Sequence, residues 1–231
     1  MTGAIIVAAG RGLRMGAGAD KLWLPVAGRP LVTHTWERID RADGIDEVIL
    51  VVRAEQRPAW IEWGARLPLR KPWRMADGGR ERQDSVRNGL DALGPGCELV
   101  AIQDGARPCT RPELVSATIA AAREHGAAAA AARVADTLKE ADERQMVVRT
   151  VDRTRLWGMQ TPQTFRVPVI RRALEAVRAG GALVTDDAAA CEWIGFPVRL
   201  VESRHPNPKA TVPADLVWIE WLLAHESPAP E

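Results

Sequence analysis

The chain has 231 residues, of which 46% are hydrophobic and 26% are charged, and its formal net charge is +1. It is long enough to bury a complete core as one large α/β domain or two small ones, and its near-zero charge argues against a protein that coats nucleic acid. No run of 18 apolar residues predicts a membrane span, and the first residues lack the pattern of a secretory signal. We therefore expect a cytoplasmic protein that binds neither nucleic acid nor a membrane.

Short aliphatic segments and helical patterns alternate along the chain. The segments expected to form strands are residues 4–9, 47–52, 99–103 and 198–202, with the alanine-rich residues 127–132 as a further strand. The segments expected to form helices are residues 31–39, 83–93, 113–124, 169–179, 186–194 and 213–224. This alternation predicts an α/β fold of the Rossmann-like, three-layer type, in which helices cover both faces of a mostly parallel twisted sheet. Ligands of such sheets bind beyond the carboxyl ends of the strands.

The first predicted strand ends in a loop that combines glycine with positive charge. Its members are Gly10, Arg11, Gly12, Arg14, Gly16, Gly18 and Lys21. Glycine lets the backbone approach a ligand and point successive N–H groups at one anion, around which the cations add positive charge. The spacing has one residue too many for a dinucleotide fingerprint and lacks the Gly-Lys-Ser/Thr ending of a Walker loop. We favour polyphosphate binding over a dinucleotide or a plain solvated turn.

Two polar residues follow the predicted strand at 99–103. Asp104 comes directly after it, and Arg107 lies three residues further on. A carboxylate at the end of a strand beside a phosphate-binding loop is well placed to hold Mg²⁺, and Arg107 could hold a second anion. An ordinary turn is the alternative interpretation, because Asp followed by Pro also initiates turns.

Residues 77–85 form a glycine turn that leads into a predicted helix. Either the hydroxyl of Ser85 or the backbone N–H of Gly79 could read the edge of a nucleobase. The alternative is that the acidic side chains of Asp77 and Asp84 only cap the helix.

Residues 204–209 connect the last predicted strand to the last helix, and they bring Asn207 and Lys209 back toward the same edge of the sheet. The alternative is a proline-rich connector. No serine nucleophile elbow or paired catalytic histidine accompanies these loops. A phosphate monoester needs no general base, because it is already ionised at neutral pH. The loops therefore indicate catalysis by cations that offset the repulsion between two phosphates.

Residues 136–160 interrupt the alternation. The segment is polar, with strand-like residues 137–139 and 147–151 around a turn at Asp142 and Glu143. This pattern predicts a β-hairpin arm that leaves the domain. Open strand edges are usually covered, so we expect a homodimer formed through the arm, with a solvated excursion as the alternative.

Taken in order, the motifs form one set over nearly the whole chain. They are Ala8-Ala-Gly-x-Gly-x-Arg14-Met15 with Lys21, Asp77-Gly-Gly-x-Glu-Arg-x-Asp-Ser85, Asp104-x-Ala-Arg-Pro108, Asp136-Thr137-x-Lys139, Thr150-Val-Asp-Arg153, Thr161-Pro-Gln163, Thr185-Asp186 and Asn207-x-Lys209. This set resembles the 2-C-methyl-D-erythritol 4-phosphate cytidylyltransferase family of the non-mevalonate isoprenoid pathway. The glycine loop is shared with many sugar-phosphate nucleotidyltransferases, whereas the ordered set, especially Thr-Val-Asp-Arg and Thr-Pro-Gln, is specific to the family that it resembles.

The resemblance implies one nucleotidyltransferase domain over residues 1–225, with the dimerisation arm at 136–160 and a flexible tail at 226–231. It implies an enzyme that transfers the cytidylyl group of CTP to 2-C-methyl-D-erythritol 4-phosphate. The products would be 4-diphosphocytidyl-2-C-methyl-D-erythritol and pyrophosphate, and the cofactor Mg²⁺ or another divalent cation. The alternatives are a cytidylyltransferase for another polyol phosphate, such as ribitol 5-phosphate, and a non-catalytic nucleotide-binding module.

The resemblance also assigns roles to individual residues. The implied catalytic residues are Arg14, Lys21, Arg153 and Lys209. The implied nucleotide-binding residues are Ala8, Ala9, Gly10, Gly12, Gly79, Ser85 and Asp104, of which Asp104 also holds the metal. The implied residues for the second substrate are Arg107, Thr137, Arg153, Thr185 and Lys209. Arms are exchanged within dimers of the family, so Thr137 and Arg153 are expected to act on the partner's substrate. Asp20 stands where proline is usual and is expected to weaken the field of Lys21.

Overall fold

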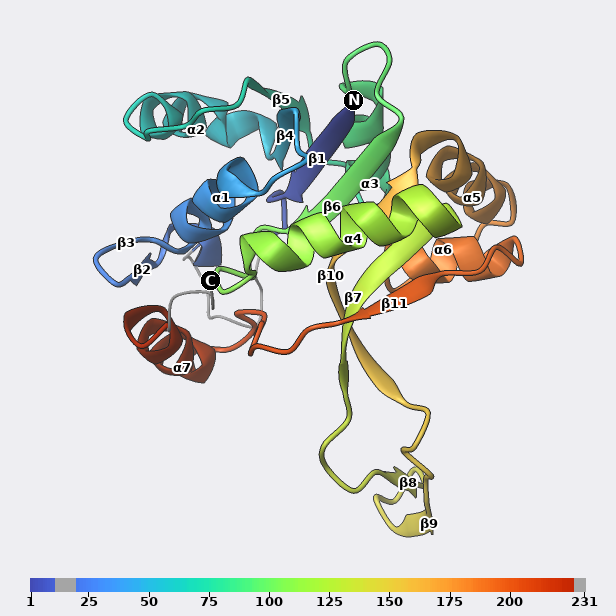
Figure 1. The fold of residues 1–231 in the computed structure, drawn as a ribbon. Coiled ribbons are helices and arrows are strands. Elements are labelled where there is room, and N and C mark those ends of the chain that lie inside the picture. Colours follow the sequence, from blue (N-terminus) through green and yellow to red (C-terminus); the bar gives the residue numbers. More distant parts are fainter. Residues whose placement is uncertain (11–19, 227–231) are drawn as a thin grey trace.

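The structure is a computed structural model that describes residues 1–10 and 20–226. Its centre is a seven-stranded sheet with the order β11-β7-β10-β6-β1-β4-β5 (Figure 1). The strands are β1 (Thr2–Val7), β4 (Glu47–Val52), β5 (Trp73–Asp77), β6 (Leu99–Asp104), β7 (Ala127–Arg133), β10 (Trp157–Arg166) and β11 (Arg199–Glu202). All neighbouring pairs are parallel except those of β10, which runs antiparallel to both β6 and β7. The predicted mostly parallel sheet is confirmed.

Helices cover both faces of this sheet (Figure 1). They are α1 (Leu31–Arg41), α2 (Arg57–Gly64), α3 (Arg82–Asp91), α4 (Pro112–His125), α5 (Val167–Ala179), α6 (Asp187–Trp193) and α7 (Pro213–Ala224). Two single-turn 3-10 helices, η2 (Lys21–Trp23) and η3 (Ala54–Gln56), and a two-stranded ribbon of β2 (Pro25–Val26) and β3 (Arg29–Pro30) complete the body. Among the described helices, none combines the length and the hydrophobicity that crossing a bilayer requires.

The core forms on both sides of the sheet because side chains alternate along each strand. Ala4 and Ile6 of β1 pack in the cluster that contains α1 and α4, whereas Ile5 packs in the cluster that contains α3, α5 and α6. Helix α4 begins with Pro112 and ends at His125, and the next residue, Gly126, stops it with a positive φ of 86°. The three-layer architecture predicted from the sequence is therefore present.

Two strands of the sheet, β5 and β10, and the helix α2 were not predicted from the sequence. Strand β5 is a half-exposed edge strand with polar residues, and α2 has no strong amphipathic pattern, so neither gives a clear periodic signal. Strand β10 begins at Trp157, inside the segment predicted as arm, and its sequence through Thr161 and Gln163 is polar although that half is buried. The prediction missed β10 because buried glutamine and threonine look like loop residues.

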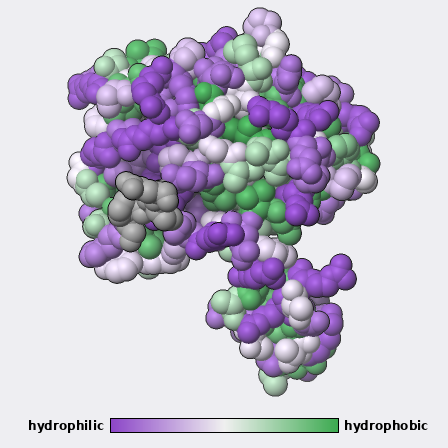
Figure 2. Space-filling view, in the orientation of Figure 1, coloured by the Kyte–Doolittle hydropathy of each residue, from purple (hydrophilic) through white to green (hydrophobic). Residues whose placement is uncertain are grey.

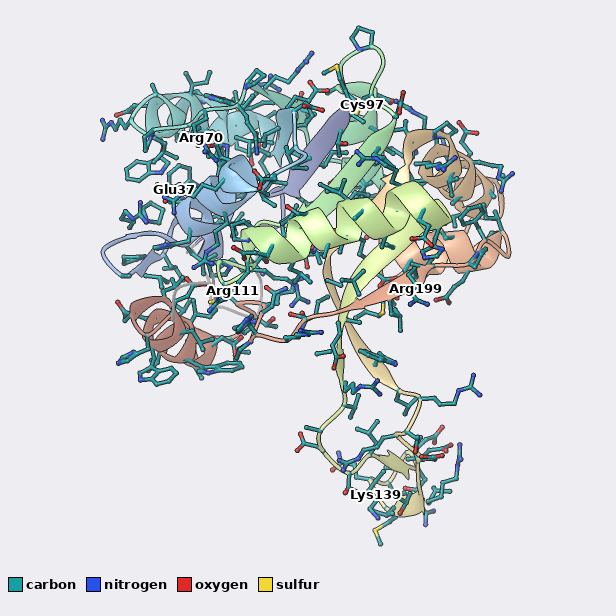
Figure 3. The ribbon with its side chains drawn as sticks, viewed as in Figure 1. Glu37, Arg70, Cys97, Arg111, Lys139 and Arg199 are labelled. Atoms are coloured by element: carbon teal, nitrogen blue, oxygen red, sulfur yellow. The ribbon has the colours of Figure 1, made fainter. Side chains whose placement is uncertain are left out.

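The arm itself is present. Strands β8 (Lys139–Ala141) and β9 (Val147–Thr150) pair in an antiparallel ribbon, which stands away from the body as a separate lobe (Figures 1 and 2). Lys139 on the arm lies far from Arg111 on the body (Figure 3). Met146, Val147 and Val148 are each at least 60% exposed, so the arm carries apolar side chains that its own chain leaves uncovered.

Glu226, the last described residue, has ionic contacts with the body of the domain. The predicted flexible tail starts at Glu226, but this carboxylate pairs with Arg38 of α1 and lies 3.2 Å from the guanidinium of Arg111. These ion pairs fix the segment after α7 against the body. Residues 227–231 lie outside the described part of the chain.

Candidate active site

A cavity of about 700 Å³ lies at the carboxyl edge of the sheet, between the loops that follow β1, β4, β5 and β6. Residues predicted for the nucleotide or for catalysis line it, namely Ala9, Gly10, Lys21, Gly79, Ser85, Asp104 and Lys209. Ala8 does not line it, because its side chain is buried and its N–H donates to the carbonyl of Val51. Gly12 and Arg14 lie outside the described residues.

The glycine turn after β5 touches the loop after β1. A Cβ atom on Gly78 would lie only 2.2 Å from the Cβ of Ala9, so a side chain at this position is excluded. Next to it, the N–H of Gly79 donates to Ser85 Oγ at 3.0 Å, and Ser85 Oγ also donates to the carbonyl of Glu81. Ser85 therefore shapes the turn that forms one wall of the cavity.

The capping interpretation of Asp84 is also correct. The Asp84 carboxylate accepts the N–H of Glu81 at the start of α3, whereas Asp77 pairs with Arg57 at 2.6 Å. In this segment Asp84 caps the helix, whereas Gly79 and Ser85 line the cavity.

Lys21 starts the 3-10 helix η2, and its ammonium group donates to the carbonyl of Ala210 at 3.0 Å. Asp20 caps this helix through the N–H of Leu22. Its carboxylate also lies 2.6 Å from the guanidinium of Arg53. Asp20 was expected to weaken the positive field of Lys21. Its negative charge is instead paired with the guanidinium of Arg53.

A second cavity of about 370 Å³ adjoins the first and is lined by Thr185, Arg107, Gln160, Asp186 and Glu192, among others. Both cavities share three wall residues, Arg82, Asp104 and Lys209. The structure thus brings together five of the seven residues predicted for the nucleotide and three of those predicted for the second substrate. The place where the two sets meet is Asp104.

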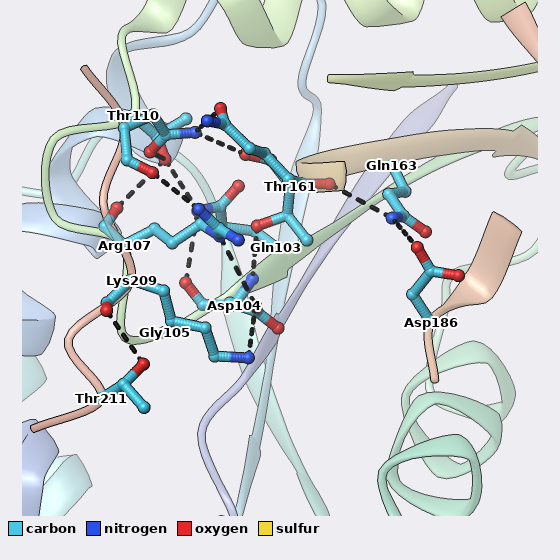
Figure 4. Close-up of polar contacts among 12 residues, drawn as sticks. Gln103, Asp104, Gly105, Arg107, Thr110, Thr161, Gln163, Asp186, Lys209 and Thr211 are labelled. Carbon is cyan, nitrogen blue, oxygen red and sulfur yellow. Dashed lines mark hydrogen bonds and ion pairs between the residues drawn. The ribbon is translucent and has the colours of Figure 1, made fainter. Parts of the chain in front are cut away.

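Asp104 is surrounded by three cations, of which Figure 4 shows Lys209 and Arg107 and the third is Arg82. Its carboxylate oxygens lie 2.8 Å from Lys209 Nζ, 3.4 Å from Arg82 Nε and 3.6 Å from Arg107 Nε. Burial by itself raises the pKa of the Asp104 carboxyl, but the three cations outweigh burial and lower the pKa to about 2. Asp104 is therefore a permanent anion that holds these cations in place.

The loop that carries Lys209 is held by Asn207, which is 3% exposed. Its side-chain nitrogen donates to the carbonyl of Thr161 at 2.9 Å, its side-chain oxygen accepts from Thr110 Oγ1 at 2.8 Å, and its carbonyl accepts from Arg107 at 2.6 Å. One interpretation of the sequence has Asn207 reach the ligand. The structure instead makes it the internal support for Lys209 and Arg107.

The Thr-Pro-Gln motif supports the second cavity in the same way. The N–H of Asp104 donates to Thr161 Oγ1 at 3.0 Å, and Gln163 Nε2 donates to Asp186 at 2.8 Å (Figure 4). Gln163 Oε1 accepts the N–H groups of Asp187 and Ala188 at the start of α6. These contacts position the helix start beside Thr185.

The two predicted residues of the arm are not in either cavity of their own chain. Thr137 and Arg153 are exposed, and Arg153 donates to the carbonyl of Ala135 within the arm. The structure brings neither of them to Asp104, so an action on the second substrate within the same chain has no geometric support.

Comparisons with known proteins identify the relatives of this chain. The family model of 2-C-methyl-D-erythritol 4-phosphate cytidylyltransferase matches residues 2–225. The chain is 44% identical to a protein of that name from Geobacillus kaustophilus over 221 residues, which is 96% of each chain. It superimposes on 4-diphosphocytidyl-2C-methyl-D-erythritol synthase from Anaerococcus prevotii with a TM-score of 0.86 and 32% identity, covering 97% of this chain and 96% of that one.

The chain belongs to the 2-C-methyl-D-erythritol 4-phosphate cytidylyltransferase family. A further member, from Thermus thermophilus, superimposes with a TM-score of 0.77 and 32% identity over 97% of this chain and the whole of that one. The resemblance stated from the motifs is confirmed, and so are the α/β fold and the assignment to the nucleotidyltransferase enzymes.

Sequence reasoning did not single out three residues of the cytidylyltransferase site. Arg53 lines the first cavity, Arg82 lines both cavities, and Asp187 pairs with Arg82 from behind the wall. Arg82 lies within a quoted motif, and its place at the start of a helix, directly after the glycine turn, was the available signal. Asp187 gave no signal, since a carboxylate at a helix start is usually an exposed cap.

The part of the chain in residues 1–10 and 20–226 contains no cluster of three or more histidine, cysteine or acidic side chains arranged to hold a metal. Mg²⁺ in phosphate-transfer sites is commonly bound by one or two carboxylates together with substrate phosphates. Asp104 offers one carboxylate at the point where the cavities meet, and its low pKa keeps this carboxylate ionised. The donor set therefore fits a magnesium ion shared with a nucleotide.

Proposed function

We propose that this protein transfers the cytidylyl group of CTP to 2-C-methyl-D-erythritol 4-phosphate. The observation that carries the proposal is the pair of adjoining cavities that share Asp104, Lys209 and Arg82. A transferase of this kind must hold a nucleotide and a phosphate monoester side by side. The larger cavity, beside the glycine loop and Lys21, would take CTP, and the smaller one would take the polyol phosphate.

In the proposed reaction, a phosphate oxygen of the polyol phosphate attacks the α-phosphorus of CTP. A new oxygen–phosphorus bond forms, the bond between the α-phosphorus and the bridging oxygen breaks, and pyrophosphate leaves with the electron pair. The attacking group is already ionised at neutral pH, so no base has to remove a proton. Catalysis then consists of positioning and charge stabilisation.

The cations of the site would divide this work. Lys21, together with Arg14, would stabilise the triphosphate as negative charge moves to the leaving pyrophosphate. Arg107 and Lys209, with the hydroxyl of Thr185, would hold the attacking phosphate in the second cavity. Asp104 would bind Mg²⁺ or another divalent cation, which supplies further neutralisation of the phosphate charges when bound.

We further propose that the enzyme acts as a homodimer in which the arm of one subunit completes the site of the other. Three facts support this proposal: Thr137 and Arg153 are exposed, they lie outside both cavities of their own chain, and the arm carries uncovered apolar side chains. A guanidinium such as that of Arg153 suits a phosphate, to which it can donate two hydrogen bonds. A cytoplasmic location stays a prediction from the sequence.

The test is a substrate panel scored by release of pyrophosphate. CTP is offered with 2-C-methyl-D-erythritol 4-phosphate, with ribitol 5-phosphate and with other sugar phosphates, and ATP, GTP and UTP replace CTP in parallel. The proposal expects rapid release only with CTP and the methylerythritol phosphate, and a large loss in Lys209→Ala, which removes one of the shared cations. Preference for ribitol 5-phosphate or for another nucleotide would contradict it.

A further inference from the structure

The first residue of α6, Asp187, carries a carboxylate that is 1% exposed and lines neither cavity. One of its oxygens lies 2.8 Å from a terminal nitrogen of Arg82. Burial raises the pKa of Asp187, and the charge of Arg82 acts in the opposite direction. A buried carboxylate is unfavourable for folding unless it is paired, so its presence here calls for a role beyond packing.

Arg82, at the start of α3, reaches two carboxylates at once. While its terminal nitrogen meets Asp187, its Nε lies 3.4 Å from Asp104. The planar guanidinium presents donors in fixed directions, so anchoring one end determines where the other end lies. Because the same side chain forms a wall of both cavities, its orientation affects the place where the two substrates would meet.

The backbone beneath Asp187 is fixed independently. Gln163 accepts the N–H groups of Asp187 and Ala188 at 3.1 and 2.9 Å. The start of α6 is therefore held without the carboxylate, which leaves the carboxylate one described ionic partner, Arg82. Removing its charge should change the orientation of Arg82 more than the position of the helix.

We propose that Asp187 is a positioning residue, which holds the guanidinium of Arg82 across the boundary between the two cavities and thereby keeps Asp104 and Lys209 in place for transfer. The inference rests on the proposed function. Without the charge of Asp187, the remaining anionic partner of Arg82 is Asp104, where Arg82 competes with Lys209 at 2.8 Å. The displaced cations would then no longer match the transition state, while each substrate would keep its other contacts.

The test compares Asp187→Asn with a matched control at the end of the sheet that lies away from the two cavities. Glu47, at the start of β4, is also a buried carboxylate, and it pairs with one arginine, Arg74, at 2.5 Å. We expect Asp187→Asn to lower kcat by about tenfold or more, since small displacements in an aligned site are costly. Both KM values should stay within about threefold of wild type, and Glu47→Gln should keep wild-type kcat. A wild-type kcat in folded Asp187→Asn would overturn the proposal.

If Asp187→Asn does not fold, a second variant, Arg82→Lys, tests the same positioning role. Arg82→Lys retains the positive charge, but an ammonium group lacks the two-pronged geometry needed to span both carboxylates. We expect the same fall in kcat with little change in either KM. Wild-type kcat in Arg82→Lys would overturn the proposal.

A melting experiment separates this inference from the proposed function, because it needs no substrate. Asp104→Asn and Asp187→Asn are measured singly and together. If Arg82 joins the two carboxylates, the shifts in Tm do not add, since contacts in one network are coupled. Additive shifts would overturn the linkage. An inactive wild-type enzyme with non-additive shifts would contradict the proposed substrates and leave the linkage supported.

Discussion

At the scale of single residues, the site uses a buried anion to hold mobile cations. Asp104 is 7% exposed and lies within 3.6 Å of nitrogens from Lys209, Arg82 and Arg107. Lysine and arginine side chains lose much rotamer freedom when they are ordered. Holding them before substrate arrives reduces the cost of ordering them during the reaction.

Lys21 is predicted to be one of these catalytic cations. We expect Lys21→Ala to lower kcat by on the order of 10²-fold or more, the scale for losing one group that stabilises charge in a transition state. The variant should melt close to wild type. Lys71→Ala is a matched control, because Lys71 also donates to backbone carbonyls, those of Ile39 and Ala42, away from both cavities. Near-normal kcat in Lys21→Ala would refute the role.

The carboxylate of Asp104 is predicted to bind the divalent cation. Activity should vanish with a chelator and return with Mg²⁺, and Asp104→Asn should shift the Mg²⁺ dependence of the rate to higher concentrations. The amide keeps the shape of the side chain but loses its charge. A chelator-resistant enzyme, or an unchanged Mg²⁺ titration in the variant, would rule out this assignment.

At the scale of elements, strand ends and loops bring distant residues together. Lys209 comes from the segment between β11 and α7, yet it reaches Asp104 at the end of β6. The arm does the opposite: Thr137 precedes β8, Arg153 follows β9, and the ribbon of these strands stands away from the body. The first arrangement is complete within one chain, whereas the second fits the proposed exchange of arms between two subunits.

The arm gives the prediction at this scale. Arg153→Lys should raise KM for the polyol phosphate and leave KM for CTP almost unchanged, because a lysine cannot make the two parallel hydrogen bonds of a guanidinium. Mixed dimers of Lys21→Ala and Arg153→Ala subunits should regain activity, since one of their two sites keeps both residues. Verified mixed dimers as inactive as their parents would show that Arg153 acts within its own chain.

At the scale of the whole molecule, the alternating pattern was sufficient to predict the three-layer architecture, and Asp104 and Lys209 marked the edge of the sheet at which the two cavities lie. Strand β10 was missed because its buried residues Thr161, Gln163 and Thr164 are polar. Their burial depends on partners elsewhere in the fold: Asp104 for Thr161, Asp186 for Gln163 and Thr118 for Thr164. The local sequence cannot reveal that distant residues supply hydrogen bonds to these buried polar side chains.

The difference between local and long-range contacts also explains which residues of the candidate site could be predicted. Lys21 and Lys209 stand in loops between predicted elements, where polar residues suggest function, and Ser85 closely follows a glycine turn at the start of a predicted helix. Arg82 and Asp187 form an ion pair between the starts of two helices that are more than 100 residues apart. Only the packing of both helices against α5 brings the two helix starts together, so no pattern along the chain could have paired these residues.

The most direct test of the central claim is phosphorus NMR of a reaction containing the enzyme, Mg²⁺, CTP and 2-C-methyl-D-erythritol 4-phosphate. Transfer predicts that the monoester signal disappears while pyrophosphate and a diphosphate with two mutually coupled phosphorus signals form in equal amounts. The reason is that one new bond joins the polyol phosphate to the α-phosphorus for each pyrophosphate released. CMP and pyrophosphate with the monoester unchanged would mean hydrolysis instead of transfer, and would contradict the account.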